Sequence, residues 1–423
     1  MNEPQHAIDS QSMQCTGCEE NTIVKDSDKT RQVNSKHPLV VGCLLLGVAA
    51  IPDAMIVPVL HDLTVERFGV SQGSAHLLMV VNLLGALVAI GLLAMFKRRI
   101  PSSVLLLGAA LLSALFMGCM AISTSWGMML TFRCFEGGAD LILLAIPFRL
   151  IAGAGKKERY GGRIGGGFTS MMVALAVGAG LGGAIGRESP VAVLWAGTFI
   201  MLVLTLIIAF VRRTVDNLPP SPLPEPHRCP LIPREWFGAG FLAIDRGLSA
   251  LVSTSLPLLL ASGFNIGKMT LGIALAGMFL SLAVFAAPAG ILADRHGGGK
   301  IRLISSLFCG FALAGLGLMA WLPPVVVLPP CLLIYGAGAA GLMPSAFSIA
   351  VRPNASNLVF GSLQTAGQAG YAIGVLCGAW IISVVALPAG TILSGMFPIA
   401  GALFIAVNML LLVLLRNLPK SVR

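Results

Sequence analysis

Twelve long apolar runs, separated by short polar breaks, constrain the fold of this chain more than any other feature. A helix needs about 20 apolar residues to cross a membrane core of about 30 Å. The runs are continuous, as at Phe199–Phe210, whereas a strand of a membrane barrel would alternate apolar and polar residues. We therefore predict an all-α polytopic membrane protein. Its expected spans are residues 39–60, 75–96, 101–123, 126–148, 164–186, 190–211, 236–260, 267–292, 301–322, 326–350, 358–385 and 391–415.

Composition excludes several classes of protein. Charged residues make up 11% of the chain, against about 25% in soluble domains, and 56% of the residues are hydrophobic, so neither an ordinary soluble enzyme nor a disordered chain fits. The sequence has no phosphate-binding loop and no H-E-x-x-H or G-x-S-x-G motif. We expect no enzymatic activity, no catalytic residue, no cofactor and no metal. Cys15 and Cys18 form a C-x-x-C pair, but no second pair completes a four-ligand site.

The polar breaks divide the chain into two similar halves. Residues 1–37 form a polar tail that we expect to be disordered and cytoplasmic, and residues 38–211 hold six spans. Residues 212–235 form a linker whose seven prolines oppose a continuous helix. Residues 236–416 hold six further spans, and residues 417–423 form a second short tail.

The distribution of Lys and Arg predicts the orientation of the chain. If the N-terminus is cytoplasmic, inner segments hold 23 of the 28 Lys and Arg residues and outer segments hold 3. Inner loops of membrane proteins carry such an excess. We therefore expect both termini in the cytoplasm and the protein in the plasma (inner) membrane. The net charge of +10 then reflects topology and anionic lipid, so we expect no nucleic-acid partner.

Six ionisable residues are expected inside spans, where such residues are costly and are functional candidates. They are Asp53, Arg133, Glu136, Asp140, Asp245 and Arg246. A rise of about 1.5 Å per residue places the first three in one layer and the last three in a second layer nearer the cytoplasm. We counted Arg302 with the inner loops. In the eleventh span, Gln364 and Gln368 are candidates either for binding substrate or for bonds between helices.

Arg133, Glu136 and Asp140 follow one helical stripe at i, i+3 and i+7. A carboxylate in a dry cavity is pulled toward protonation by desolvation and toward ionisation by a nearby arginine. We hypothesise that Asp53 and Glu136 compete for Arg133, so that protonation of one acid frees the other for substrate. The alternative is an ion network that holds helices together. His61 is a candidate proton entry point or a solvated loop residue.

Three motifs resemble the major facilitator superfamily. Residues 290–297 (GILADRHG) resemble its signature loop, residues 132–139 (FRCFEGGA) its R-x-x-x-G motif, and residues 178–183 (GAGLGG) the fifth-span motif of its proton-antiporter branches. The likeness extends over residues 38–416. Two positions depart from the family pattern: Met95 replaces the aspartate of the first-half loop, and Ala179 replaces a proline.

The resemblance implies two six-helix halves that rock about a central cavity, and a latch at the cytoplasmic face. In the latch, the aspartate of the signature loop would accept hydrogen bonds at the N-terminus of the fifth span. The latch residues would be Gly290, Asp294, Arg295 and Gly297. Because Met95 lacks a carboxylate, we predict one latch instead of two. Close helix packing is expected at Gly178, Gly182 and Gly183.

The function that we expect is proton-coupled export of a small organic molecule by a monomer in contact with membrane lipid. Two alternatives remain open at this stage. One is proton symport or facilitated uptake of a metabolite. The other, from a different class, is a transporter-like sensor or assembly factor that binds a ligand without moving it.

Overall fold

Helices account for nearly all of the described residues, and no strand occurs among them. The computed structural model describes residues 36–96, 101–153, 160–216, 233–350, 357–384 and 389–417. The N-terminal half consists of α2 (Lys36–Ile56), η1 (Val57–Val59), η2 (Asp62–Glu66), α3 (Gln72–Ala75), α4 (Leu77–Phe96), α5 (Ser102–Ile122), α6 (Trp126–Gly153), α7 (Tyr160–Glu188) and α8 (Pro190–Asp216). The C-terminal half consists of α9 (Pro233–Ala250), η4 (Leu251–Ser255), α10 (Leu256–Phe264), α11 (Lys268–His296), α12 (Gly298–Leu316), η5 (Gly317–Ala320), α13 (Pro324–Ala350), α14 (Asn357–Val384) and α15 (Ala389–Arg416).

Each of the twelve predicted spans corresponds to a helix or to two helices joined by a short irregular turn. Eleven segments of the described residues are long and apolar enough to cross a membrane. The remaining predicted span is α6, which has 28 residues and differs by its charges: Arg133, Glu136, Asp140 and Arg149. The prediction of an all-α, multi-pass membrane protein is therefore confirmed.

The start of the linker lies further along the chain than expected. Helix α8 continues through Arg212 and ends at Asp216, so the predicted boundary at residue 211 is wrong. Asp216 has a structural role, because its carboxylate accepts bonds from the Ser103 amide at 3.0 Å and the Ser103 hydroxyl at 2.6 Å. These bonds satisfy donors at the N-terminus of α5. Residues 217–232, and both tails with Cys15 and Cys18, lie outside the described residues.

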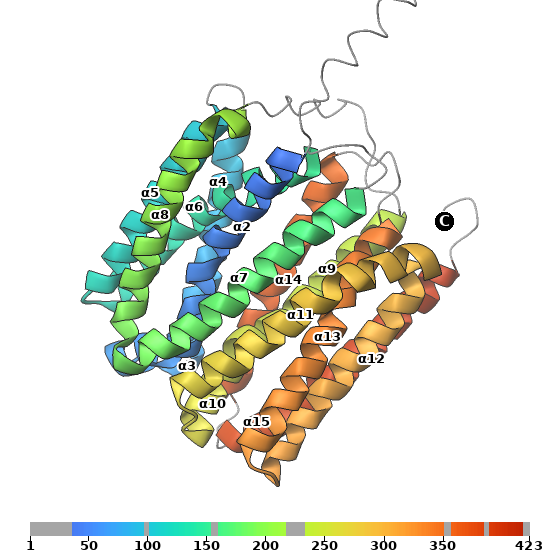
Figure 1. The fold of residues 1–423 in the computed structure, drawn as a ribbon. Helices are drawn as coiled ribbons and strands as arrows, with labels where there is room; N and C mark the ends of the chain where they lie inside the picture. The colour runs from blue at the N-terminus through green and yellow to red at the C-terminus, as the bar shows by residue number, and fades with distance from the viewer. Residues whose placement is uncertain are drawn as a thin grey trace, which may run out of the picture.

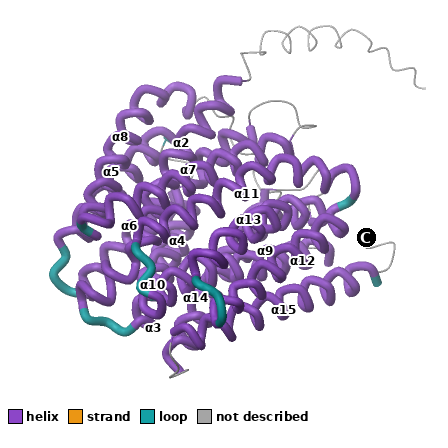
Figure 2. Tube along the Cα trace, turned by 60° about the horizontal axis from the view of Figure 1, so that its bottom comes forward, coloured by secondary structure: helices purple, strands orange, loops and turns teal. Residues whose placement is uncertain are grey.

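The two halves meet along α7 and α11, which run side by side through the middle of the bundle (Figure 1). A glycine pair brings the two backbones together: a Cβ on Gly183 would lie 2.7 Å from the Lys268 carbonyl oxygen and 3.0 Å from the Gly272 Cα. Short loops connect the helices at the end of the bundle that carries α3 and α10 (Figure 2). This is the end that we predict to face the outside.

Glycines also join α7 to α2. A Cβ on Gly178 would overlap the carbonyl oxygen of Ile51, and one on Gly182 would overlap that of Met55. All three glycines predicted to serve helix packing therefore lie where two backbones touch. In a membrane, small residues let helices approach closely enough for van der Waals contact to hold them.

The first and seventh spans are both irregular. Pro52 lies inside α2, where it removes one hydrogen bond of the helix, and α2 passes into the 3-10 turn η1. In the seventh span, the π-helical turn η4 separates α9 from α10. Such turns are frequent at functional sites. Asp53 directly follows the α2 proline, and Asp245 lies one and a half turns before η4.

Candidate functional site

The centre of the N-terminal half holds a buried arginine between two acids. The Arg133 guanidinium donates to Glu136 at 2.5 Å and to Asp53 at 2.8 Å. Arg133 and Glu136 come from α6, whereas Asp53 comes from α2 beside the proline kink. The three residues that we placed in one layer are thus in direct contact, and Arg133 binds both acids at once.

The Glu136 carboxylate accepts hydrogen bonds from three side chains of this cluster. Besides Arg133, it accepts hydrogen bonds from Asn82 of α4 at 3.1 Å and from Ser113 of α5 at 3.2 Å. A close approach of α4 to α6 makes the first of these bonds possible, because a Cβ on Gly137 would overlap the Asn82 carbonyl oxygen. The neighbouring helices therefore fix the Glu136 carboxylate in place.

Accessibility separates the two acids. The side chain of Glu136 is 1% exposed and that of Asp53 is 33% exposed. A carboxylate that touches open space can exchange a proton or a ligand, whereas one enclosed by donors exchanges slowly. Asp53 is therefore the acid of this pair that is more open to exchange.

Asp140 lies in a different place from the one predicted. It is buried on α6, within electrostatic range of Arg133 and Glu136 and within hydrogen-bonding reach of Asp53. Our assignment of Asp140 to a second layer with Asp245 and Arg246 is therefore wrong. The two depths were estimated from predicted span ends, and an error of a few residues at each end shifts a residue by about 5 Å. The cluster thus holds three acids and one arginine.

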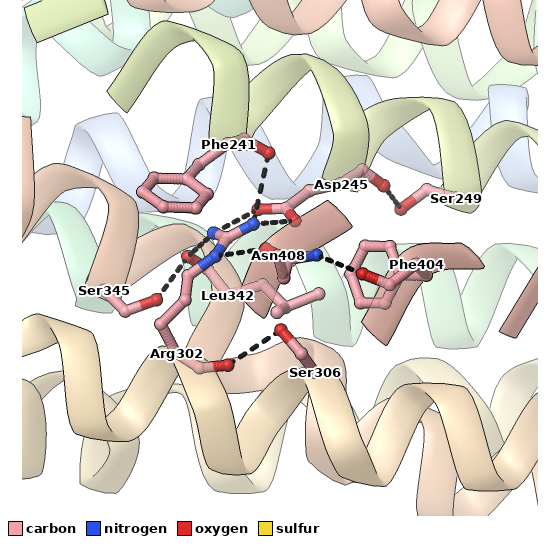
Figure 3. Close-up of polar contacts among 9 residues, drawn as sticks. All are labelled: Phe241, Asp245, Ser249, Arg302, Ser306, Leu342, Ser345, Phe404 and Asn408. Atoms are coloured by element: carbon pink, nitrogen blue, oxygen red, sulfur yellow. Dashed lines mark hydrogen bonds and ion pairs between the residues drawn. The ribbon is translucent and has the colours of Figure 1, made fainter. Parts of the chain in front are cut away.

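A second buried arginine organises the C-terminal half (Figure 3). Arg302 of α12 forms a bidentate ion pair with Asp245 of α9, at 2.5 and 2.8 Å, and donates to Asn408 of α15 at 2.8 Å. Its remaining bonds reach the carbonyl oxygens of Leu342 at 3.1 Å and Phe241 at 3.3 Å. All five guanidinium N–H groups therefore have an acceptor.

The sequence analysis missed this arginine. Arg302 has no exposed surface, although we counted it with the inner loops because it is the second residue of its predicted span. The helix starts earlier, at Gly298, so Arg302 lies one turn inside it. Two signals could have identified it: Asp245 needs a cation at a similar depth, and Asn408 is a polar residue inside the last apolar run.

No hydrogen bond joins Arg246 to this network within the described residues, although Asp245 lies within its electrostatic range. It is half-buried, and it lies within electrostatic range of Tyr371 of α14 and Tyr335 of α13. The Tyr371 hydroxyl is hydrogen-bonded to Ser253 at 3.0 Å. The neighbouring residues Asp245 and Arg246 thus face different surroundings, as their adjacency on a helix requires.

The structure places the other predicted residues as follows. Gln368 is half-buried on α14, whereas the side chain of Gln364 lies outside the described residues. In the predicted latch, Gly290 approaches Pro344, Arg295 is exposed, and Gly297 has a φ of +89° that favours glycine. The side chains of Asp294 and Met95 lie outside the described residues, so the latch stays a prediction.

Two polar contacts join the halves at the end predicted to face outside. Asp62 of η2 forms an ion pair with Lys268, the first residue of α11. His76, which is fully buried, is hydrogen-bonded to Ser255 of η4 at 3.0 Å. The other ring nitrogen of His76 faces the Gln72 carbonyl oxygen at 2.9 Å. Residues of both halves therefore close this end of the bundle.

The surroundings of Asp62 favour its ionised form. Burial opposes its ionisation, but hydrogen bonds and charges from His61 and Lys268 outweigh burial and hold the pKa of Asp62 below its usual value. His61, Asp62 and Glu66 place ligand atoms within 4.8 Å of one another. The ammonium group of Lys268 already neutralises Asp62, so we interpret this group as a contact between halves and not as a metal site.

Comparisons with known proteins agree with this architecture. The family model of the Major Facilitator Superfamily matches residues 42–246, which include the Arg133 cluster. No curated protein matches the sequence. Among solved structures, the human organic anion transporter MFSD10 (TETRAN) is 17% identical and has a TM-score of 0.64. That alignment covers 91% of this chain and 100% of the transporter.

Two further structures are similar at lower identity. A transporter of the POT family, solved with a thioalcohol-conjugated peptide, is 12% identical over 90% of this chain and 96% of its own, with a TM-score of 0.71. PepTSo2 is 11% identical over 91% of this chain and 99% of its own, with a TM-score of 0.68. These alignments extend over both halves of the chain, and the three structures share one fold. Residues 42–246 of the chain thus match the major facilitator superfamily, and about nine-tenths of the chain shares the fold of these solved transporters.

Proposed function

We propose that the protein is a secondary active transporter that exports a small organic molecule in exchange for protons, by alternating access. The observation that carries the proposal is the unequal exposure of two acids on one arginine. Asp53 is one-third exposed, whereas Glu136 is enclosed by Arg133, Asn82 and Ser113. One acid of the pair can thus exchange a proton while the other holds the arginine in place.

The proposed coupling follows from the contacts of Asp53. When Asp53 is ionised, it binds Arg133 at 2.8 Å. A proton on Asp53 would remove this charge and leave Arg133 paired with Glu136 alone. Asp140 lies within hydrogen-bonding reach of Asp53, so a proton can be held between the two carboxyl groups. Substrate and proton would then alternate on Asp53, as exchange requires.

The contacts between halves support alternating access. The Asp62–Lys268 ion pair and the His76–Ser255 hydrogen bond join the halves at the end that we place outside. Both must break before a central site can open to that side. The excess of Lys and Arg in inner segments supports cytoplasmic termini and insertion in the plasma membrane.

Export is the direction favoured by the GAGLGG motif of α7, which resembles that of proton antiporters. Proton symport and ligand sensing without flux are the alternatives, and one measurement separates them. Purified protein would be reconstituted in liposomes that enclose a pH dye. The panel should contain organic cations, neutral metabolites, organic anions and short peptides, because solved relatives include an organic anion transporter and a transporter bound to a peptide conjugate.

We expect a substrate-dependent proton signal whose direction is opposite to that of the substrate. Asp53→Asn should lower coupled flux at least tenfold, while Glu188→Gln, which removes an exposed carboxylate at the end of α7, should leave it unchanged. Proton movement in the same direction as substrate would indicate symport. Flux without proton movement, or binding without flux, would refute the proposal.

A further inference from the structure

Arg246 forms no ion pair within the described part of the chain, although Asp245 lies within its electrostatic range. Both oxygens of its neighbour Asp245 are taken by Arg302, at 2.8 and 2.5 Å. No other carboxylate of the described residues lies within 4.0 Å of the Arg246 guanidinium. The Arg246 stem packs closely on Gly367 of α14, since a Cβ there would lie 3.3 Å from the Arg246 Cγ. An unpaired charge inside a membrane is costly and marks a functional site.

The N-terminal half carries the opposite excess. Asp53, Glu136 and Asp140 share one arginine, and Asp53 is the acid with a substantially exposed side chain. Asp53 is therefore the acid of this cluster that a cationic group can reach. Each half thus offers one accessible charge, and the two charges have opposite signs.

Tyr371 links these two charges in space. Its ring lies on α14 within electrostatic range of Asp53 and Arg133 of the N-terminal half and of Arg246 of the C-terminal half. Helix α14 packs on α9, because a Cβ on Gly370 would overlap the Ala243 carbonyl oxygen. The same helix contacts α4 and α3 of the other half, and Figure 1 shows it behind α7 where the halves meet.

We propose that the transported molecule is a dipolar organic ion whose cationic group binds Asp53 and whose anionic group binds Arg246, with Tyr371 between them. This inference rests on the proposed transport function and specifies its substrate class. The planar guanidinium of Arg246 can hold a carboxylate or another oxyanion through two parallel bonds. A substrate with a single charge would leave one of the two charged side chains without a partner. A dipolar substrate neutralises both side chains and also bridges the two halves.

A series of unbranched ω-amino acids tests the proposal, with alkylamines and alkyl carboxylates of equal length as single-charge controls. Binding to the full-length protein in lipid nanodiscs would be measured by calorimetry, and proton-linked flux in liposomes. We expect the best amino acid to bind at least about tenfold more tightly than either control, because it gains a second charge-assisted hydrogen bond that each control lacks.

Two variants test which side chain binds each charged group of the substrate. Arg246→Gln should abolish the preference for the amino acid over the amine, and Asp53→Asn the preference over the carboxylate. Arg246→Lys keeps the charge on a shorter side chain, so it should retain the preference and move the optimum to a longer amino acid. Arg213→Gln, at an exposed position of α8, is the matched control and should change neither value.

Other outcomes would overturn the substrate class. A single-charge control that binds as tightly as the amino acid would do so, as would a panel in which nothing binds or an Arg246→Gln variant with unchanged preferences. If an amine shows proton-coupled flux that is the same in Arg246→Gln as in the unmodified protein, the dipolar substrate is rejected and proton coupling is retained. Flux of the amino acid without proton movement would reject the coupling and leave the dipolar site intact.

Discussion

Each half of the molecule buries an arginine and an acid in its core, but the two clusters differ in charge balance and access. In the C-terminal half, Arg302 and Asp245 match one to one, and every guanidinium N–H has an acceptor (Figure 3). In the N-terminal half, Arg133 faces three acids, and its Nε has no hydrogen-bond acceptor among the described residues. The side chain of Asp53 is also one-third exposed.

We infer from this difference that the Arg302 cluster holds the C-terminal half together, whereas the Arg133 cluster binds a ligand or a proton. The Arg302 network joins α9, α12, α13 and α15, and no guanidinium donor is left over for a substrate. The Arg133 cluster has one acid more exposed than the others and an excess of negative charge that a proton or a cationic group would relieve. We therefore expect damage to the first cluster to cost folding, and damage to the second to cost transport.

The largest effect should come from removing one partner of the closed network. Arg302→Met leaves Asp245 buried without its cation, and breaking a buried pair costs about 3–5 kcal/mol. We expect little folded protein, measured as monodisperse yield and as the midpoint of thermal unfolding. Replacing both partners, in Arg302→Met with Asp245→Leu, should restore much of the yield, because no uncompensated charge remains. A double variant that folds but does not transport would show that this network also serves function.

The sequence predicted the spans well because apolar length is a local property. All twelve expected spans contain helix, and their ends differ by a few residues, as at Asp216. The sequence also identified Asp53, Arg133 and Glu136, because charges within apolar runs are few and conspicuous. What it could not give was depth to better than one helical turn, and that error misplaced Asp140 and left Arg302 with the loops.

The sequence also could not predict which polar residues of different spans bind one another. Asp245 pairs with a residue of another span 57 positions away, and Asn82 and Ser113 bind Glu136 from two different helices. These contacts depend on how close α4 and α6 approach, which glycines such as Gly137 allow. A glycine is visible in the sequence, but the backbone that it meets becomes known from the packed structure.

An intermediate effect is expected at Glu136. Glu136→Gln keeps the shape and the bonds from Ser113 but removes the charge that faces Arg133. A hydrogen bond between charged groups contributes about 1.5–3 kcal/mol, so the free energy of unfolding should fall by about 2 kcal/mol. Transport should fall too, because Arg133 is then free to bind Asp53 more tightly. Asp53→Asn, measured in parallel, should lose transport with a stability loss below about 1 kcal/mol, since its side chain is partly solvated.

Equal stability losses for the two variants would contradict this order. They would mean that Asp53 is as much a part of the packed core as Glu136, and the contrast between a holding acid and an exchanging acid would fail. A conserved rate of transport in Asp53→Asn, with normal folding, would be the second contradiction. The unfolding midpoint and the initial rate of flux, measured on the same preparations, decide both.

The smallest effect should come from the Asp62–Lys268 contact between the halves. Lys268→Gln removes one partly exposed ion pair, which is worth at most about 1 kcal/mol, so the ratio of closed to open states should change by no more than about fivefold. Spin labels at the exposed positions Thr124 and Leu322, in a cysteine-free background, would report that ratio as a distance distribution. Lys300→Gln, at the other end of the bundle, is the matched control.

The pH dependence of the same distribution tests the charge of Asp62. Because the pKa of Asp62 is held below its usual value of about 3.9, the ion pair is present above that value and is lost as the pH falls through the lowered one. Protonation of Asp62 therefore cannot open this end of the bundle between pH 7 and pH 5. Asp62→Asn, which removes the titrating group itself, should show the same change over that range as the unmodified protein. An opening on acidification that Asp62→Asn abolishes would instead assign the proton switch to Asp62 and remove it from the Arg133 cluster.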